Sequence, residues 1–166
     1  WEVGIDQALL DRQLIVSLSW FREELEDEIN GFVFDPDTGG TTADNEDGNS
    51  DREGLEFNGS WALGSALDLH LAYTWLDATE DDADGGSSDE IRRPEHIASA
   101  GVNWRLLDDR ANINLHVDYN GEQDDLFFPP FPPWQERVEL DDFTLITLSG
   151  SYRFDNGLQV FARVEN

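Results

Sequence analysis

The chain has 166 residues, of which 37 are acidic and 10 are basic, and its formal net charge is −27. A chain this acidic is a poor partner for nucleic acid, whose phosphates bind Lys and Arg, and the absence of cysteine excludes disulfides and thiolate metal sites. The six Trp and ten Phe argue against a disordered acidic tail, and no apolar run is long enough for a transmembrane helix.

Alternation of apolar and polar residues begins near the N-terminus. A short first strand is expected at Val3–Ile5, and a longer second strand is expected from Gln13 to about Asp35. Leu14, Val16 and Leu18 share one face of that second strand because side chains alternate along a strand. Six further alternating apolar faces lie at 55–63, 67–75, 98–106, 113–119, 146–154 and 158–164. None of these faces carries a charge. With the two strands near the N-terminus, the six further faces make eight predicted antiparallel strands.

The connections between these strands alternate in length. Short ones lie near 9–12, 64–66, 107–110 and 155–157, and long ones span about 35–53, 77–90 and 122–142. Such an alternation indicates an up-and-down meander with all tight turns at one end. Outer-membrane barrels have this asymmetry, with short periplasmic turns and long outer loops.

Charged and aromatic residues follow the same polarity. Each long connection holds seven acids, which together make 21 of the 37 in the chain, and the acid run at 23–28 is interpreted as a solvated extension of the second strand. Aromatic residues fall near both ends of the apolar faces, as in the two interfacial girdles of a membrane barrel. They are Trp20, Tyr73, Trp75 and Tyr119 toward the long loops, and Trp61, Trp104, Tyr152 and Phe154 toward the short turns. The predicted fold class is an all-β, antiparallel, up-and-down transmembrane β-barrel segment.

Seven stretches of the chain resemble, in order, motifs of one known family. They are Leu14–Glu28, Arg52–Phe57 (REGLEF), Leu69–Asp77 (LHLAYTWLD), Arg92–His96 (RRPEH), Asp118–Asp125 (DYNGEQDD), Leu140–Phe154 and Gly157–Asn166 (GLQVFARVEN). Together they resemble the C-terminal barrel of TonB-dependent outer-membrane receptors of the cobalamin and siderophore type. The resemblance covers nearly the whole chain.

The resemblance implies an organisation and a role. Residues 1–166 would form part of a receptor barrel, about eight of about 22 strands, without the plug domain and the last strand. The parent would lie in the outer membrane of a Gram-negative bacterium and would take up a scarce chelate, either a ferric siderophore or cobalamin. It would not be an enzyme, so no catalytic residue is expected. Its partners would be outer-membrane lipid and lipopolysaccharide, the TonB complex acting through the plug, and the chelate, with no nucleic acid.

Two alternatives remain open from the residues alone. Eight strands suffice to close a small barrel, which would give an outer-membrane structural or adhesion protein. The other alternative is a secreted β-sandwich that binds calcium or glycans.

Three groups of residues are candidate sites. Phe128, Phe131 and Trp134, within the stretch FFPPFPPW, are expected either to contact ligand at a loop tip or to pack against neighbouring loops or lipopolysaccharide. Asp44, Glu46 and Asp51 are candidate calcium ligands, although their loop lacks the glutamate of an EF-hand and the pattern favours an ordinary acidic loop over a calcium site.

The third group follows from the resemblance. Arg163 and Glu165, on the last strand, would form an ion pair facing the lumen and plug. His70 and His116 would also face the lumen, as polar lining rather than as metal ligands.

Overall fold

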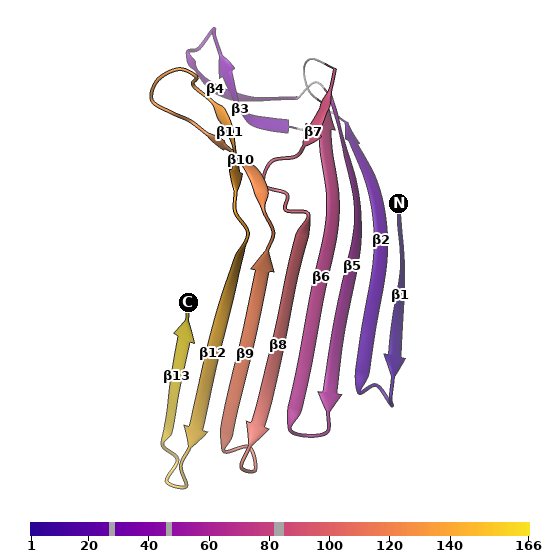
Figure 1. Cartoon of the computed structure of the whole chain (residues 1–166), viewed down its shortest axis with the longest axis vertical. Helices are drawn as coiled ribbons and strands as arrows, with labels where there is room; N and C mark the ends of the chain where they lie inside the picture. The colour runs from indigo at the N-terminus through magenta and orange to yellow at the C-terminus, as the bar shows by residue number, and fades with distance from the viewer. Residues whose placement is uncertain (27–28, 46–47, 82–84) are drawn as a thin grey trace.

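The fold is known from a computed structural model, which describes residues 1–26, 29–45, 48–81 and 85–166. One curved antiparallel sheet makes up most of the chain, and we call it the wall (Figure 1). Its strands, in order across the sheet, are β1 (Glu2–Leu9), β2 (Leu14–Glu26), β5 (Asn49–Leu63), β6 (Leu67–Asp81), β8 (His96–Leu106), β9 (Ala111–Asn120), β12 (Phe143–Arg153) and β13 (Gln159–Glu165). These are the eight predicted strands, in the predicted meander.

Register between neighbouring strands confirms the predicted faces. Across the middle of the wall, Val16 pairs with Gly59, Gly59 with Leu71, and Leu71 with Ala100. Ala100 then pairs with Val117. Paired residues in a sheet point to the same side, so every predicted apolar position lies on one face, which we call the apolar face. The opposite, polar face carries residues such as Ser17, Asn58, His70 and Asp118.

The four short connections lie together at one end of the wall (Figure 1). Two of them are tight turns in which non-glycine residues adopt positive φ: Asp11 and Arg12 at 53° and 67°, and Asp108 and Asp109 at 54° and 62°. Leu10 and Leu107, which precede these pairs, also adopt positive φ, at 52° and 54°, so each turn is a run of three residues in the left-handed region.

The long connections contain strands of their own. β3 (Ile29–Asp35) pairs with β4 (Gly40–Asn45), β10 (Gln123–Phe127) pairs with β11 (Glu136–Leu140), and the short β7 (Ser87–Asp89) pairs with the upper part of β6. These hairpins project from the end of the wall opposite the short turns (Figure 1).

Two predictions about strand length need correction. The second strand was expected to run to about Asp35, but β2 ends at Glu26 and β3 belongs to a separate two-stranded sheet. The acidic ribbon is nevertheless present as far as Glu26, which pairs with Asn49. The first strand is longer than Val3–Ile5, because β1 pairs with β2 over its whole length from Glu2 to Leu9.

A single curved layer has almost no interior. Among the described residues the buried apolar side chains are the small ones of Ala78 and Pro94, and large residues of the apolar face remain exposed, such as Leu71 at 48% and Leu148 at 49%. No helix in the described part of the chain is long and apolar enough to cross a membrane. The wall is open, since β1 and β13 lie at opposite edges of the sheet (Figure 1). A closed eight-stranded barrel and a two-sheet sandwich are therefore both wrong for this chain.

Candidate functional site

The segment that joins β7 to β8 fixes the geometry of the long-loop end. Arg92, with φ of 59°, donates its backbone N–H to the carbonyl of Asp124 at 2.7 Å, and its Nε to Oδ1 of Asp125 at 2.8 Å. Arg93 lies 3.3 Å from Oε2 of Glu90. The two arginines thus point to different partners, one on the β10–β11 hairpin and one within their own segment.

Beyond Pro94, Glu95 and the first residue of β8, His96, contact aromatic residues of β6. Glu95 accepts a hydrogen bond from the indole Nε1 of Trp75 at 2.9 Å. His96 lies with Nδ1 3.0 Å from the hydroxyl of Tyr73, and the two rings stack. Trp75 and Tyr73 both belong to the aromatic girdle near the long loops. The loop segment is therefore attached to the wall at the expected membrane boundary.

Glu90 is the most buried charged residue of the described chain, at 7% exposed. It accepts a hydrogen bond from Nε of Arg52 at 2.8 Å and also faces Arg93. A carboxylate so removed from water needs charged partners, and these two arginines supply them. The contact joins β5 to the β7–β8 segment across 38 residues.

A second arginine contact holds the β10–β11 hairpin. Arg137 on β11 donates Nε to Oδ2 of Asp124 at 2.6 Å, Nη1 to Oγ of Ser88 at 3.2 Å, and Nη2 to the carbonyl of Asp89. We call Arg92, Arg137 and their partners the arginine clamp. It fixes the hairpin to the β7 segment through both of the hairpin's strands.

The arginine clamp also perturbs a carboxyl group. The backbone N–H of Leu126 and the Arg92 guanidinium both donate to Asp125, and together they hold the pKa of Asp125 below its usual range. In the β3–β4 hairpin, the Thr38 hydroxyl and the Asp37 backbone N–H lower the pKa of Asp35 in the same way.

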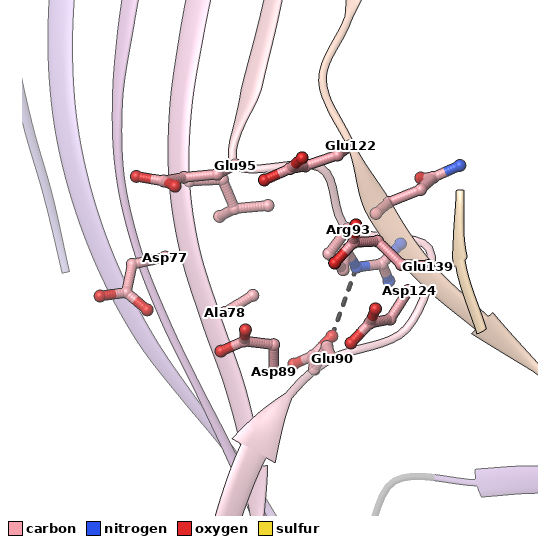
Figure 2. Close-up of a pocket in the computed structure, with 11 residues that line it drawn as sticks. Asp77, Ala78, Asp89, Glu90, Arg93, Glu95, Glu122, Asp124 and Glu139 are labelled. Atoms are coloured by element: carbon pink, nitrogen blue, oxygen red, sulfur yellow. Dashed lines mark ion pairs between the residues drawn. The ribbon is translucent and has the colours of Figure 1, made fainter. Parts of the chain in front are cut away.

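Between the clamped hairpin and the wall lies a hollow of about 330 Å³ (Figure 2). Seven carboxylates line it, with Arg93 as its one basic residue: Asp77, Asp89, Glu90, Glu95, Glu122, Asp124 and Glu139. Among the described residues no group of three or more His, Asp or Glu is arranged to hold a metal ion. Because carboxylates dominate its lining, the hollow is a region of negative potential, which repels anions and attracts cations.

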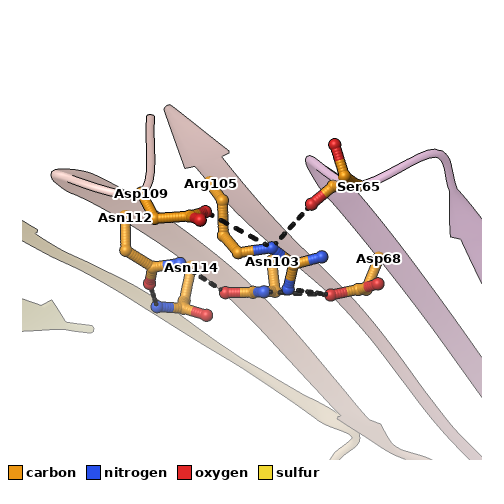
Figure 3. Close-up of polar contacts among 7 residues, drawn as sticks. All are labelled: Ser65, Asp68, Asn103, Arg105, Asp109, Asn112 and Asn114. Atoms are coloured by element: carbon orange, nitrogen blue, oxygen red, sulfur yellow. Dashed lines mark hydrogen bonds and ion pairs between the residues drawn. The ribbon is translucent and has the colours of Figure 1, made fainter. Parts of the chain in front are cut away.

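At the other end of the wall, the polar face carries a hydrogen-bonded network (Figure 3). Arg105 donates Nη1 to Asp68 at 2.6 Å and Nε to the carbonyl of Ser65 at 2.9 Å. Asn103 donates to the same Asp68 carboxylate at 3.1 Å and accepts from Asn112 at 2.7 Å. The network joins β6, β8 and β9 near the short turns, where it stiffens the polar face.

Comparison of the chain with models of known protein families gives one match. The family model described as "TonB dependent receptor-like, beta-barrel" matches residues 1–166. The chain belongs to this family. Its members are proteins of the Gram-negative outer membrane and act as transport receptors rather than enzymes, so the apolar face is the lipid face and the polar face is the lumen. No curated protein matches the chain.

Solved structures of siderophore receptors share the fold. The ferripyoverdine receptor of Pseudomonas aeruginosa, bound to ferripyoverdine, aligns with a TM-score of 0.76 and 18% identity, covering 99% of this chain and 22% of that one. The ferric-catecholate import receptor Fiu of E. coli K12 aligns with a TM-score of 0.72 and 21% identity, again over 99% and 22%. The siderophore receptor PiuA of Acinetobacter baumannii aligns at 0.68 and 16%, over 98% and 23%. The chain spans about a fifth of the length of these receptors.

The sequence-predicted residues of this TonB-dependent receptor lie in three separate places. Phe128, Phe131 and Trp134 lie in the connection between β10 and β11 and are 62%, 66% and 65% exposed. They are therefore presented to solvent at the tip of the clamped hairpin. Whether they contact a ligand stays a prediction.

Arg163 and Glu165 form an ion pair on the lumen face of β13. The Glu165 carboxylate also accepts a hydrogen bond from Thr147 on β12 at 3.1 Å. The pair is present as expected, and its proposed contact with a plug stays a prediction.

The candidate calcium residues are only partly described. Asp44 lies on β4 and Asp51 on β5, where Asp51 is 3.9 Å from Nη2 of Arg22, whereas Glu46 lies outside the described residues. Calcium binding there stays a prediction.

The two luminal histidines flank a glycine. His70, Gly101 and His116 are paired across three strands, and the rings of His70 and His116 lie 5.6 Å apart. An ideal Cβ on Gly101 would lie 2.0 Å from the His70 ring, so the absence of a side chain there creates the space that the ring occupies. His116 is held by Asp118 at 2.9 Å, consistent with polar lining.

Sequence reasoning missed the arginine clamp. Arg137 is the only basic residue between Glu122 and Asp142, a stretch with seven acids, and that isolation was the available signal. Its three partners come from two loops, a proximity that spacing along the chain does not reveal.

Proposed function

We propose that this chain forms part of the barrel wall and three outer loops of a receptor that imports a ferric siderophore across the outer membrane. The observation that carries the proposal is the family match over the whole chain, joined to an exposed aromatic tip on a hairpin held in place by arginines. Import would use energy delivered through the TonB complex. Outer-membrane lipid and lipopolysaccharide would surround the wall.

The rigid hairpin favours ligand capture over simple packing of the loop. Three large rings are exposed on the connection between β10 and β11, and two arginines attach the strands on either side of it to the β7–β8 region, so the ends of this connection are already held when a ligand arrives. Pre-ordering of a binding surface reduces the entropy lost on binding. Aromatic rings then supply a large contact area with few rotatable bonds.

The charge of the acidic hollow beside the hairpin indicates the charge of the ferric complex that the receptor would bind. Seven carboxylates, two of which (Glu90 and Asp124) are paired with arginines, give the hollow an excess of negative charge that opposes the approach of a ferric complex with several negative charges. The chelate is therefore a neutral or cationic ferric complex, such as a hydroxamate type, rather than a polyanionic catecholate type. Cobalamin, which the sequence left open, is the second candidate.

Binding to the full-length receptor tests the proposal. Quenching of tryptophan fluorescence would be titrated with a neutral ferric hydroxamate, a ferric catecholate and cobalamin. The hydroxamate should bind most tightly, and the triple variant Phe128→Ala, Phe131→Ala, Trp134→Ala should weaken its binding by about tenfold or more, from the loss of at least about 1.4 kcal/mol of contact. A matched control is Phe154→Ala, an exposed aromatic residue at the short-turn end.

The outcomes separate the candidates. Binding of cobalamin alone would replace the siderophore assignment. Unchanged affinity in the triple variant would remove the aromatic tip from the ligand site. Tightest binding of the catecholate would contradict the role given to the acidic hollow.

A further inference from the structure

The lipid face is not uniformly convex. An open groove of about 400 Å³ crosses it, and its lining is almost entirely apolar. The row Val16, Gly59, Leu71, Ala100 and Val117, in register on five neighbouring strands, forms one side of the groove. The groove therefore runs across β2, β5, β6, β8 and β9.

Two small residues create the depth of the groove. Gly59 and Ala100 are flanked by the larger Val16, Leu71 and Val117 in the same row. The ring of Phe57 lies beside Gly59, at 3.3 Å from where a Cβ would be, and forms a side of the groove rather than filling it. A larger residue at position 100 would project into the space.

The groove lies in one half of the membrane. On β5 the row lies at Gly59. Gly59 is two residues from Trp61 of the short-turn girdle, a rise of about 7 Å, and four residues from Leu55, a rise of about 13 Å. Leu55 pairs with Trp20 and Trp75, which mark the other girdle and bind Glu53 and Glu95 at its edge. The groove is therefore nearer the short turns, which face the periplasm in such barrels.

The dimensions suit a single hydrocarbon chain. Four strand spacings of about 4.8 Å give the groove a length of about 19 Å. Each leaflet contributes about half of the roughly 30 Å hydrocarbon core, so one acyl chain spans about 15 Å in depth. Barrel strands tilt by about 35–45°, and a groove running across them is correspondingly oblique to the membrane normal.

We propose that this groove binds one acyl chain of a phospholipid from the periplasmic leaflet and holds it at a fixed place on the barrel. The occupant is lipid because the groove opens on the lipid face between the two girdles, where hydrocarbon is the solvent. What distinguishes this place is the groove itself, in which Gly59 and Ala100 are enclosed by larger side chains from five strands.

Photo-crosslinking locates such a lipid. The full-length receptor would be reconstituted into vesicles of phosphatidylethanolamine and phosphatidylglycerol that contain a phospholipid with a diazirine on its acyl chain. After irradiation, mass spectrometry would map the labelled peptides. Those around Gly59 and Ala100 should carry several-fold more label than peptides from the lipid face of β12 and β13.

Filling the groove should remove that preference. Ala100→Phe should lower the label at β5 and β8 to the level of the other strands, whereas Ala98→Phe, on the same face of the same strand but outside the groove lining, should leave it unchanged. Heat-modifiable gel migration checks that each barrel is folded, and Ala100→Leu replaces Ala100→Phe if the larger residue prevents folding. Uniform labelling of the wild-type wall, or equal labelling in the two variants, would overturn the proposal.

Discussion

At the scale of single residues, Asp125 shows how charge holds an outer loop. Its carboxylate accepts hydrogen bonds from the Leu126 backbone and from Arg92, and its pKa is lowered. A carboxyl group with a lowered pKa in the folded protein stabilises the fold fully above its unfolded pKa of about 3.9. That stabilisation is lost as the pH falls through the lower, folded pKa.

We therefore expect acid to loosen the β10–β11 hairpin. Protection of the hairpin amides in the full-length receptor, measured by hydrogen exchange and corrected for the intrinsic pH dependence of exchange, should fall as the pH drops through the lowered pKa of Asp125. Asp125→Asn should make exchange fast at neutral pH and flatten its dependence on acid. Glu139→Gln, which removes a charge from the paired strand, is the control, and an Asn variant with an unaltered pH profile would refute this role for Asp125.

Gly54, the glycine of the stretch REGLEF, is explained by close contacts. A Cβ there would lie 2.4 Å from the ring of Phe21 on β2 and 2.9 Å from the backbone carbonyl of Trp75 on β6. The ring can move, but the carbonyl belongs to the sheet and cannot move without straining it.

Gly54→Ala should therefore destabilise the barrel by about 1–3 kcal/mol, as overpacking does elsewhere. Denaturation of the reconstituted receptor in urea measures the change. Adding Phe21→Ala should recover only part of the loss, because the contact with the Trp75 carbonyl remains. Full recovery would show that the ring alone makes glycine necessary.

At the scale of strands, each element has one face toward lipid and one toward the lumen. Leu115 and Asn114 are adjacent on β9, yet Leu115 pairs with Val102 on the lipid face and Asn114 pairs with Asn103 on the lumen face. The two positions therefore share their strand and differ in the side of the wall they occupy.

Leu115→Lys should cost about 2–4 kcal/mol in the intact barrel, since a charge near the middle of the bilayer loses its water. Asn114→Lys should have a small effect. Both free energies of unfolding can be measured in lipid vesicles. Equal costs at the two positions would contradict the assignment of the faces.

Alternation predicted these faces because it depends only on the period of a strand. The register of Val16, Gly59 and Leu71 follows from the same pattern, since a slip of one residue would turn an apolar face toward the lumen. The β3–β4 and β10–β11 hairpins were not predicted, because acids and Pro interrupt the alternation in both loops.

The candidate site was less accessible to sequence reasoning. The aromatic tip at Phe128, Phe131 and Trp134 was recognisable by its contrast with the acids around it. The contacts of Arg137 with Ser88 and Asp89 join positions 49 and 48 residues apart, and only the folded arrangement of two loops brings them together.

At the scale of the whole molecule, the wall has two free edges. β1 and β13 each pair with one neighbour, and both strands are exposed along their length. Exposed edges with unpaired backbone groups promote association with other chains. The lipid face adds a large exposed apolar surface, and such surfaces promote association in water.

Residues 1–166 expressed alone should therefore self-associate, whereas the whole barrel in detergent should be monodisperse. Size-exclusion chromatography with light scattering compares the two. A monodisperse monomer of the isolated segment in the absence of detergent would contradict an open wall with an exposed lipid face.

The arginine clamp also has a mechanical consequence. Arg137 and Arg92 attach the β10–β11 hairpin to the segment between β7 and β8, and Glu95 and His96 attach that segment to aromatic residues of the wall. These contacts form a continuous series from the β10–β11 hairpin to the aromatic girdle near the long loops. A force applied at the aromatic tip would therefore reach Trp75 on β6 through Arg92 and Glu95, so the outer hairpin and the barrel wall are mechanically coupled.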